Sequence, residues 1–557
     1  MENSGIVHRT SSSEKMGYDA KPADYDPETV HIRGLETSAE TSLHRGLKAR
    51  HITMIAIGGA IGTGLIIGTG RALAQAGPGS IFISYSVVGF VVFLVMAALG
   101  EMAAWLPMSA GFTGYASRFC DPSLGFALGW TSVVNLTAAA LVIQYWVPRE
   151  RVNPGVWVAI FLVIIVCINY FGIRFFGEFE FWLSSFKVIV ICGVILLSLI
   201  IATGGADGDA RGFRYWRDPG AFKPFINEGP SGRFLGFWST MVTATFAYLG
   251  TELVGVTVGE AQNPRKTIPR AIKLTFYRIV FFYCISIFLL GMCVPYNDPG
   301  LAFATSSVSN ANASPFVVAI KNARIRTLDH ILNACILVFV FSASNSDLYI
   351  ASRTLYGLAS DGSAPNIFRK TDNRGVPLYA LGASACFALL AFMNVSDDSR
   401  NVFIYFVDMV TIFGLMTWIS ILVTHIWFVR ARRAQGLANS ALPYVAPLGI
   451  YGSYGALAVC ILISLTKSFQ VFVGGRWNTA TFVTSYLGIP IYLILIFGHK
   501  AWTRSKGVRP HECDFYTGKD IIDREEEAFL AAKAAAKAEK NPSGGSAFYK
   551  KYVSWLL

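Results

Sequence analysis

Long apolar runs alternate with short polar connections along most of this chain. Each run is long enough to cross the ~30 Å hydrocarbon layer of a bilayer as an α-helix, which takes ~20 residues. The runs lie at residues 52–73, 79–106, 123–147, 155–172, 181–202, 235–258, 274–295, 331–357, 377–394, 402–429, 446–468 and 480–499. This pattern predicts an all-α polytopic membrane protein with about 12 transmembrane helices and both termini on the same side.

Two of these runs are interrupted by glycine. The first contains Ile57-Gly58-Gly59-Ala60-Ile61-Gly62-Thr63-Gly64-Leu65, and the sixth contains Tyr248-Leu249-Gly250-Thr251-Glu252. A helix can open at such a segment and leave bare N–H and C=O groups, which a membrane protein tolerates only where they line a cavity or hold a ligand. Two such breaks well apart are typical of secondary transporters, whose site lies between inverted repeats. We therefore expect a 5+5 inverted repeat with broken helices 1 and 6, followed by two further spans.

The composition agrees with a membrane protein. The 557 residues are 53% hydrophobic and 15% charged, with a mean hydropathy of +0.47, which is too apolar for soluble domains. We find no nucleotide-binding loop, catalytic triad or metal-ligand cluster. The nine cysteines follow no metal or redox spacing. We therefore expect no enzyme, no cofactor and no metal site.

Basic residues set the predicted orientation, because they are retained on the cytosolic side. They concentrate beside the apolar region and in its even-numbered connections, at Arg45, Lys48, Arg50, Arg265, Lys266, Arg270, Lys273, Arg278, Arg353, Arg369, Lys370, Arg374, Arg430, Arg432, Arg433, Lys500, Arg504 and Lys506. The loop after the fifth span is an exception, with Arg211, Arg214, Arg217, Lys223 and Arg233 offset by Asp207, Asp209, Asp218 and Glu228. The net charge of +12 thus reports topology, and no nucleic-acid partner is needed to explain it.

We divide the chain into three parts. Residues 1–47 are polar and contain no signal peptide, which predicts a disordered cytosolic tail. Residues 48–500 form the transmembrane domain. Residues 501–557 form a second cytosolic tail, with a short helix from Asp523 to Lys540. Ubiquitin and trafficking machinery would act on these tails, and sequons begin at Asn312 and Asn394 in expected outer loops.

Several motifs resemble those of the fungal amino-acid permeases of the amino acid–polyamine–organocation superfamily. They are Leu47-Lys48-Ala49-Arg50-His51-Ile52, Gly58-Gly59-Ala60-Ile61-Gly62-Thr63-Gly64, Gly100-Glu101-Met102-Ala103, Gly250-Thr251-Glu252-Leu253-Val254-Gly255, Gly259-Glu260-Ala261-Gln262-Asn263-Pro264-Arg265-Lys266, Ser342-Ala343-Ser344-Asn345-Ser346-Asp347-Leu348-Tyr349 and Ser352-Arg353-Thr354-Leu355-Tyr356. Thr267 to Tyr296 and Phe339 to Leu358 look most like the dicarboxylic amino acid permease branch. The resemblance implies a plasma-membrane, proton-coupled amino-acid symporter.

One stretch departs from the family pattern. Only Thr131-Ser132-Val133-Val134-Asn135 separates Gly129-Trp130 from Leu136-Thr137-Ala138-Ala139, where the family has a longer, aromatic-rich stretch. Either the third helix is shortened or the gene model has lost a few codons. The missing piece normally contributes pocket-facing residues, so the departure concerns substrate choice and activity more than fold.

The first break has the groups that an α-amino acid requires. Around Gly58, Ala60, Ile61, Gly62, Thr63 and Gly64, bare N–H groups at a helix N-terminus attract a carboxylate. Carbonyl groups at the end of the inner half-helix accept an ammonium. The alternative is that these small residues only allow close helix packing.

The sixth span adds a second set of candidates. Thr245, Tyr248, Gly250 and Thr251 lie at its break, where the backbone would accept the substrate ammonium and Tyr248 would act as an aromatic lid. The alternative is that Phe246 and Tyr248 pack in the core. Glu252 follows the break within the membrane, where a carboxylate is costly. It is either a protonatable coupling group or a structural hydrogen-bond acceptor.

Lys187 lies seven residues past Glu180, ~10 Å into the fifth span at helical rise. In proton-coupled relatives a lysine on this helix reaches the unwound first span and replaces a sodium ion, so the resemblance implies a coupling role. The alternatives are static bracing and snorkelling to the cytosolic surface. The cluster Asn345, Ser346 and Asp347 favours a contact between helices, and Asp408 is a further protonatable candidate.

The leading hypothesis is a proton-coupled symporter that imports L-amino acids by alternating access. The branch resemblance implies glutamate and aspartate as substrates. A side-chain carboxylate needs a cationic partner, yet we find no Arg or Lys at mid-depth near Thr245 or Asn135. Neutral amino acids therefore stay open. So do an amino-acid sensor without net flux and a permease inactivated by its short third helix.

Overall fold

The computed structural model describes residues 47–539 except 60, 63, 133–152, 262, 302–313, 326, 390–391, 393–398 and 474. These described residues all lie in one compact unit, 33–557. They are almost entirely helical and contain no strand, only an isolated bridge between Leu47 and Ala261. The expected disorder of residues 1–46, both sequons and residues 133–147 of the third span fall outside the described part.

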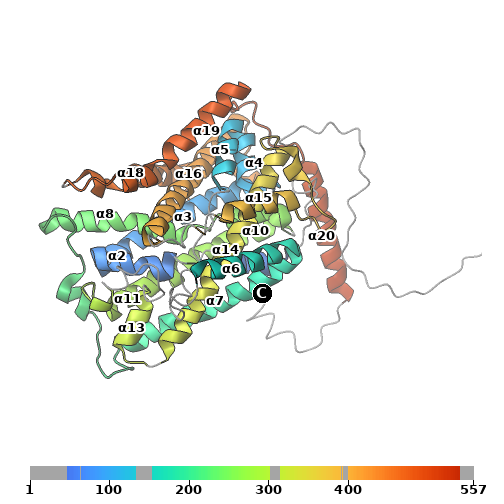
Figure 1. The fold of residues 1–557 in the computed structure, drawn as a ribbon. Coiled ribbons are helices and arrows are strands. Elements are labelled where there is room, and N and C mark those ends of the chain that lie inside the picture. Colours follow the sequence, from blue (N-terminus) through green and yellow to red (C-terminus); the bar gives the residue numbers. More distant parts are fainter. Residues whose placement is uncertain are drawn as a thin grey trace, which may run out of the picture. The chain divides into compact units, whose positions relative to one another are not determined.

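Seven helices in the described ranges are long and apolar enough to cross a membrane: Pro78–Trp105, Ile173–Ala202, Pro264–Cys293, Leu328–Ser360, Ile404–Ala434, Gly449–Thr466 and Thr479–Thr503. They correspond to α3 (Pro78–Trp105), α7 (Ile173–Ala202), α10 and α11 (Pro264–Arg278 and Ser286–Cys293), α14 (Leu328–Ser360), α16 (Ser399–Ala434), α17 (Gly449–Thr466), and α18 and α19 (Thr479–Tyr486 and Gly488–Thr503). Shorter apolar helices are α6 (Pro154–Tyr170) and α15 (Leu378–Ala388). The structure therefore confirms an all-α polytopic membrane protein (Figure 1).

The remaining predicted spans coincide with interrupted or shorter helices. The first consists of α1 (Ala49–Met54), a π-helix at Ile55–Gly59, a second π-helix at Gly64–Gly68 and α2 (Thr69–Ala76). The third begins with α5 (Pro122–Ser132), and the sixth consists of α8 (Gly229–Tyr248) and α9 (Leu253–Val256). Both glycine segments thus interrupt their helices, as predicted.

Several helices extend beyond the apolar runs that predicted them. The fifth begins at Ile173, eight residues before the predicted span at 181, and α10 begins at Pro264, ten residues before the predicted span at 274. Hydrophobicity marks only the part of a helix that meets lipid, and polar residues continue the same helix beyond it. These extensions contain charged residues, such as Glu178 of α7 and Lys266 of α10.

The core is built around α3 and α14. The first packs against α8, α10, α16 and α17, and the second packs against α6, α7 and α15 (Figure 1). Two short helices that the sequence did not predict, α4 (Gly111–Phe119) and α13 (Pro315–Asn322), lie at connections. Beyond α19 the chain forms α20 (Lys519–Glu539), close to the predicted tail helix.

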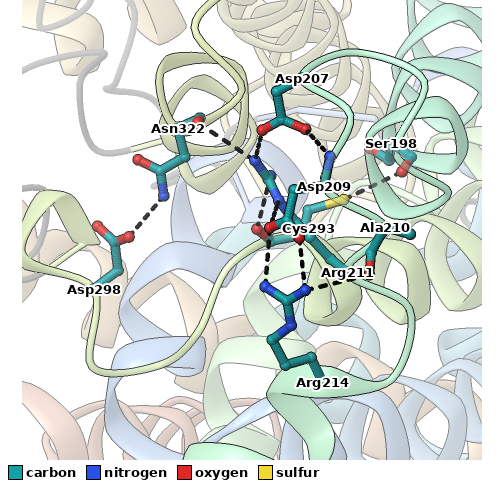
Figure 2. A network of polar contacts seen from close by, with 9 residues as sticks. All are labelled: Ser198, Asp207, Asp209, Ala210, Arg211, Arg214, Cys293, Asp298 and Asn322. Carbon is teal, nitrogen blue, oxygen red and sulfur yellow. Dashed lines mark hydrogen bonds and ion pairs between the residues drawn. The ribbon is translucent and has the colours of Figure 1, made fainter.

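The loop after α7, which broke the charge rule, is held by ion pairs (Figure 2). Arg211 Nη2 lies 2.5 Å from Asp207 Oδ2, and both Nη atoms of Arg214 donate to the two oxygens of Asp209 at 2.9 and 2.6 Å. Arg211 also donates to the carbonyl oxygens of Cys293 and Asn322, at 3.5 and 3.4 Å. The exceptional charges therefore fix this loop to the ends of α11 and α13.

Residues 504–539 pack back onto the helices, although the sequence predicted a tail. Arg118 Nη2 lies 3.0 Å from Asp514 Oδ2, and Trp105 Nε1 donates to the Phe515 carbonyl oxygen at 3.1 Å. The Phe515 ring is buried between Phe119 and Phe428. Burial raises the pKa of the Asp514 carboxyl, but the N–H of Thr517 and the Arg118 charge outweigh it and hold that pKa below its usual value.

The helix α20 adds charged contacts to this docking. Arg265, at the start of α10, pairs with Asp523 and, at 3.2 Å, with Glu526. We call the helix ends contacted by residues 504–539 the tail-side end of the molecule.

Candidate functional site

The first interrupted helix opens as the glycine pattern predicts. One π-helical segment ends at Gly59, and the next begins at Gly64. Near the opening, Ile61 N donates to the Gly58 carbonyl oxygen at 3.0 Å. π-Helical segments are rare in proteins, and those that occur often lie at functional sites. Ala60 and Thr63 lie outside the described residues.

The sixth interrupted helix opens at Leu249 and Gly250. The helix α8 ends at Tyr248, Leu249 is extended, and Gly250 has φ +86°, in the left-handed region that favours glycine. Thr251 is buried, and its hydroxyl donates to the Tyr248 carbonyl oxygen at 3.0 Å.

Several residues at and beside the two breaks are partly exposed. They are Gly62, Phe246, Leu249, Gly250 and Asp347, whose neighbours along the same helices are mostly buried. Part of the backbone that the sequence predicted to hold a substrate is therefore less tightly packed than the helices around it.

Three of the four glycines of the first break differ in their surroundings. A Cβ added at Gly58 would lie 2.6 Å from Ser184 Cβ, and one added at Gly64 would lie 2.4 Å from Ala247 Cα. At Gly62 the nearest described atom would be Ala343 Cβ, at 3.3 Å, a tight contact with one side chain. Close packing, the alternative to ligand binding, thus applies most strongly at Gly58 and Gly64 and least at Gly62.

Tyr248 and Thr245 lie in the core. Tyr248 is fully buried, donates through its hydroxyl to the Tyr85 carbonyl oxygen at 2.9 Å, and stacks on Tyr283 with the ring centroids 4.3 Å apart. Thr245 is also buried and donates to Met241 of its own helix at 2.8 Å. Phe246, beside the same break, is partly exposed, whereas the ring of Tyr248 is not. The role of Tyr248 as an aromatic lid stays a prediction.

Lys187 reaches the first break. Its side chain is fully buried, and Nζ donates to the Gly58 carbonyl oxygen at 3.1 Å. The lysine thus points into the bundle and does not snorkel to the membrane surface. An ammonium bonded to a carbonyl of the opened helix is the arrangement that the resemblance implied.

Glu180 is a site residue that the sequence analysis used only as a reference point. Its carboxylate is fully buried 3.8 Å from Lys187 Nζ, and it accepts from Ser342 Oγ at 2.6 Å and from Asn345 Nδ2 at 3.5 Å. The cluster on α14 thus joins two helices, as predicted. An acidic residue in a membrane helix, two turns before a lysine on the same face, was the signal for this pair.

Glu252 lies apart from this pair. It is buried, and Oε2 accepts from Trp418 Nε1 of α16 at 3.5 Å and from Thr251 Oγ1 at 3.4 Å. No ion pair joins Glu252 to Lys187 in the described part of the chain. Asp408 pairs with Lys467, with Nζ 3.0 Å from Oδ1.

A buried ion pair joins α14 to the segment just beyond the sixth interrupted helix. Glu260 lies just beyond the sixth interrupted helix, and its Oε1 accepts from Arg353 Nε of α14 at 2.8 Å. The Tyr349 hydroxyl donates to the same carboxylate. The Glu260 carbonyl oxygen accepts from Leu47 N at 3.2 Å. The ends of both interrupted helices are therefore tied to α14.

Arg278 corrects one statement made from the sequence. It was counted among the basic residues of a cytosolic connection, and it was not considered as a cation beside the first break. The structure places it at the end of α10, 2% exposed, with Nη1 donating to the Ala56 carbonyl oxygen at 2.6 Å. The sequence missed it because only folding brings this helix against the first break.

The long apolar helices define a polytopic membrane protein, and two opened helices are typical of secondary transporters. The chain belongs to the amino acid permease family, whose model matches residues 51–509.

Among its relatives, the chain is 54% identical to the dicarboxylic amino acid permease of Saccharomyces cerevisiae over 92% of this chain and 86% of the relative. It is 41% identical to the proline-specific permease of Emericella nidulans over 90% and 92%. A solved structure of the nucleobase–cation symporter Mhp1 covers 80% of this chain and 98% of its own, with 15% identity and a TM-score of 0.43. The family match and the identity to the curated permeases identify the protein as an amino-acid transporter.

Proposed function

We propose that this protein is a proton-coupled symporter of the plasma membrane, with both termini in the cytosol, that imports glutamate and aspartate by alternating access. The substrate binds at the two opened helices, with its α-carboxylate on N–H groups near Gly62 and Gly64, beyond the Ile61 N–H that bonds to Gly58, and its ammonium on freed carbonyl groups. The proposal for acidic substrates is supported by the 54% identity to a dicarboxylic amino acid permease.

The observation that best supports coupling is the contact between Lys187 Nζ and the Gly58 carbonyl oxygen. A charged ammonium at this point braces the opened helix against α7, whereas a neutral amine holds it less strongly. Protonation of the buried Lys187–Glu180 pair would thus bias the position of the first helix. Glu252, on the other opened helix, is a second coupling candidate, held between Thr251 and Trp418.

Uptake by a permease-deficient yeast tests this function. Labelled glutamate should enter cells expressing the protein, faster as external pH falls from about 7 to about 5, and a protonophore should abolish the pH effect. Lys187→Met should reduce uptake at least about tenfold at unchanged surface level, since it removes a charge-assisted hydrogen bond worth roughly 1.5–3 kcal/mol.

Ser185→Ala is the matched control on the same helix, because the hydroxyl of Ser185 donates to the Phe181 carbonyl oxygen of its own turn and makes no other hydrogen bond with the described residues. Glutamate uptake insensitive to pH and protonophore would refute coupling. Uptake competed by arginine and not by aspartate would refute the acidic assignment. Surface expression without any uptake would favour a sensor, or a permease disabled by its short third helix.

A further inference from the structure

Arg278 is a buried cation whose hydrogen bonds are incomplete. It is the last residue of α10, directly before the π-helix Ile279–Ile285, and its side chain is almost fully buried. Nη1 donates to the Ala56 carbonyl oxygen at 2.6 Å, while Nε and Nη2 have no partner within the described part of the chain. A buried guanidinium with unpaired donors is costly and calls for a partner.

The two unpaired atoms define the chemistry of that partner. Nε and Nη2 form one edge of the guanidinium, and their N–H bonds are parallel. This edge matches the two oxygens of a carboxylate, which it binds bidentately. The bond from Nη1 to Ala56 fixes the orientation of the edge, so that the arginine needs little reorganisation to receive such a group.

The position of Arg278 connects this edge to the first break. Ala56 lies in the π-helical segment that ends at Gly59, so its carbonyl oxygen is one of those at the opened helix. The stacked rings of Tyr248 and Tyr283 lie beside the guanidinium and interact with it electrostatically, as does Glu252. The Glu252 carboxylate itself is bonded to Trp418 and Thr251 and makes no ion pair with Arg278 in the described residues.

We propose that Arg278 binds a carboxylate of the transported amino acid through its Nε–Nη2 edge, and that it is thereby the cation missing from the sequence-based picture of the site. This inference rests on the proposed site at the first break. That carboxylate is either the side-chain carboxylate of glutamate or aspartate, with the α-carboxylate on the backbone N–H groups, or the α-carboxylate itself. The edge is buried in this structure, so the substrate reaches it when the first helix moves during the transport cycle.

Kinetics of Arg278→Lys distinguish the two carboxylates, because lysine keeps the charge and loses the bidentate edge. Labelled glutamate and its neutral isostere glutamine are compared in the same cells. A KM for glutamate raised about tenfold or more, with little change for glutamine, supports binding of the side-chain carboxylate. An equal rise for both amino acids supports binding of the α-carboxylate.

Two results would overturn the proposal. One is an unchanged KM for both substrates with a lower maximal rate at equal surface level, which would make Arg278 a brace for the first helix. The other is recovery of Arg278→Gln uptake by an added Glu252→Gln change, which would make Glu252 the partner. Lys273→Gln is the control, because Lys273 is an exposed cation on the same helix.

A wild-type measurement covers the case in which these variants do not reach the surface. Phenylglyoxal modifies accessible guanidinium groups, and peptide mass spectrometry of membranes treated during uptake reads the modification at Arg278. Glutamate should reduce labelling at Arg278 about threefold or more, because a carboxylate bound bidentately covers the reactive edge. Labelling at Arg324, an exposed arginine that serves as the control, should not change. Absence of labelling with or without substrate would refute the proposal, since the edge would then never open.

The test stays separable from the proposed substrate class. If the wild-type protein carries glutamine or proline and not glutamate, the acidic assignment fails. The KM comparison is then made with the amino acid that is carried, and it still decides whether Arg278 binds its α-carboxylate.

Discussion

At the scale of single residues, one motif holds glycines with different roles. Gly58 and Gly64 allow close contact with Ser184 and Ala247, whereas Gly62 borders on Ala343 and is partly exposed. Both readings of the glycine segment therefore have a place in it. Substitutions can separate them, because a packing glycine acts on folding and a site glycine acts on uptake.

We expect Gly62→Val to abolish uptake of every substrate while the protein reaches the cell surface, because the added side chain lies beside the backbone N–H groups. Gly64→Val should instead lower the surface level several-fold, since its Cβ would lie 2.4 Å from a backbone atom of Ala247 and the helices must separate. Surface biotinylation with uptake in the same cells measures both effects. Normal transport by Gly62→Val would show that this glycine only serves packing.

At the scale of elements, α14 connects α7 to the segment that follows the sixth interrupted helix. Its residues Ser342 and Asn345 bind Glu180 of α7, and Arg353 binds Glu260 beyond α9. Helices that alternate between two arrangements must break and re-form such contacts. We therefore expect the buried pair of Glu260 and Arg353 to contribute to the stability of the arrangement seen here.

Glu260→Gln should destabilise the protein by about 3–5 kcal/mol, because it leaves the Arg353 charge buried without its partner. Thermal unfolding of the purified protein in detergent measures this as a lowered midpoint. The double variant Glu260→Gln with Arg353→Met should recover much of the loss, and Glu228→Gln, at an exposed position, should have no effect. A single variant that unfolds like the wild type would argue against a buried, paired charge.

At the scale of the whole molecule, the segment after α19 belongs to the folded structure. It contacts α3 through Trp105, α4 through Arg118, α10 through Arg265 and α16 through Phe428. One segment thus holds together helix ends that are far apart in the sequence. Its loss would expose apolar and charged groups that are now buried.

A truncation after Ser505 should therefore lower the unfolding midpoint and the surface level, whereas a truncation after Glu539 should leave both unchanged. Phe515→Ala should cost about 3–5 kcal/mol, as removal of a buried aromatic ring does. Fluorescence-detected size-exclusion chromatography after heating compares the three with the full chain. Equal melting of all four proteins would contradict the docked arrangement.

The sequence by itself determined the helical membrane fold and its two openings. Apolar runs long enough to cross a bilayer have few alternatives to a helix, and glycine interruptions within them have few uses other than a ligand site or close packing. Lys187 stood out too, because an intramembrane charge is costly in an apolar run, although its coupling role came from the family resemblance and stays a prediction.

Only the tertiary structure decided which separate helices and segments meet. Arg278 was assigned to a connection, and the segment around Phe515 was taken for a tail. Glu180, by contrast, lies two turns before Lys187 on one helix, and this local signal was overlooked. Arg278 contacts Ala56, 222 positions away, and Phe515 contacts Phe428, more than 80 positions away. No local periodicity in the sequence encodes such contacts. Local pattern fixes what each helix is, because burial depends on its own residues, whereas the pairing of buried charges depends on how separate helices pack.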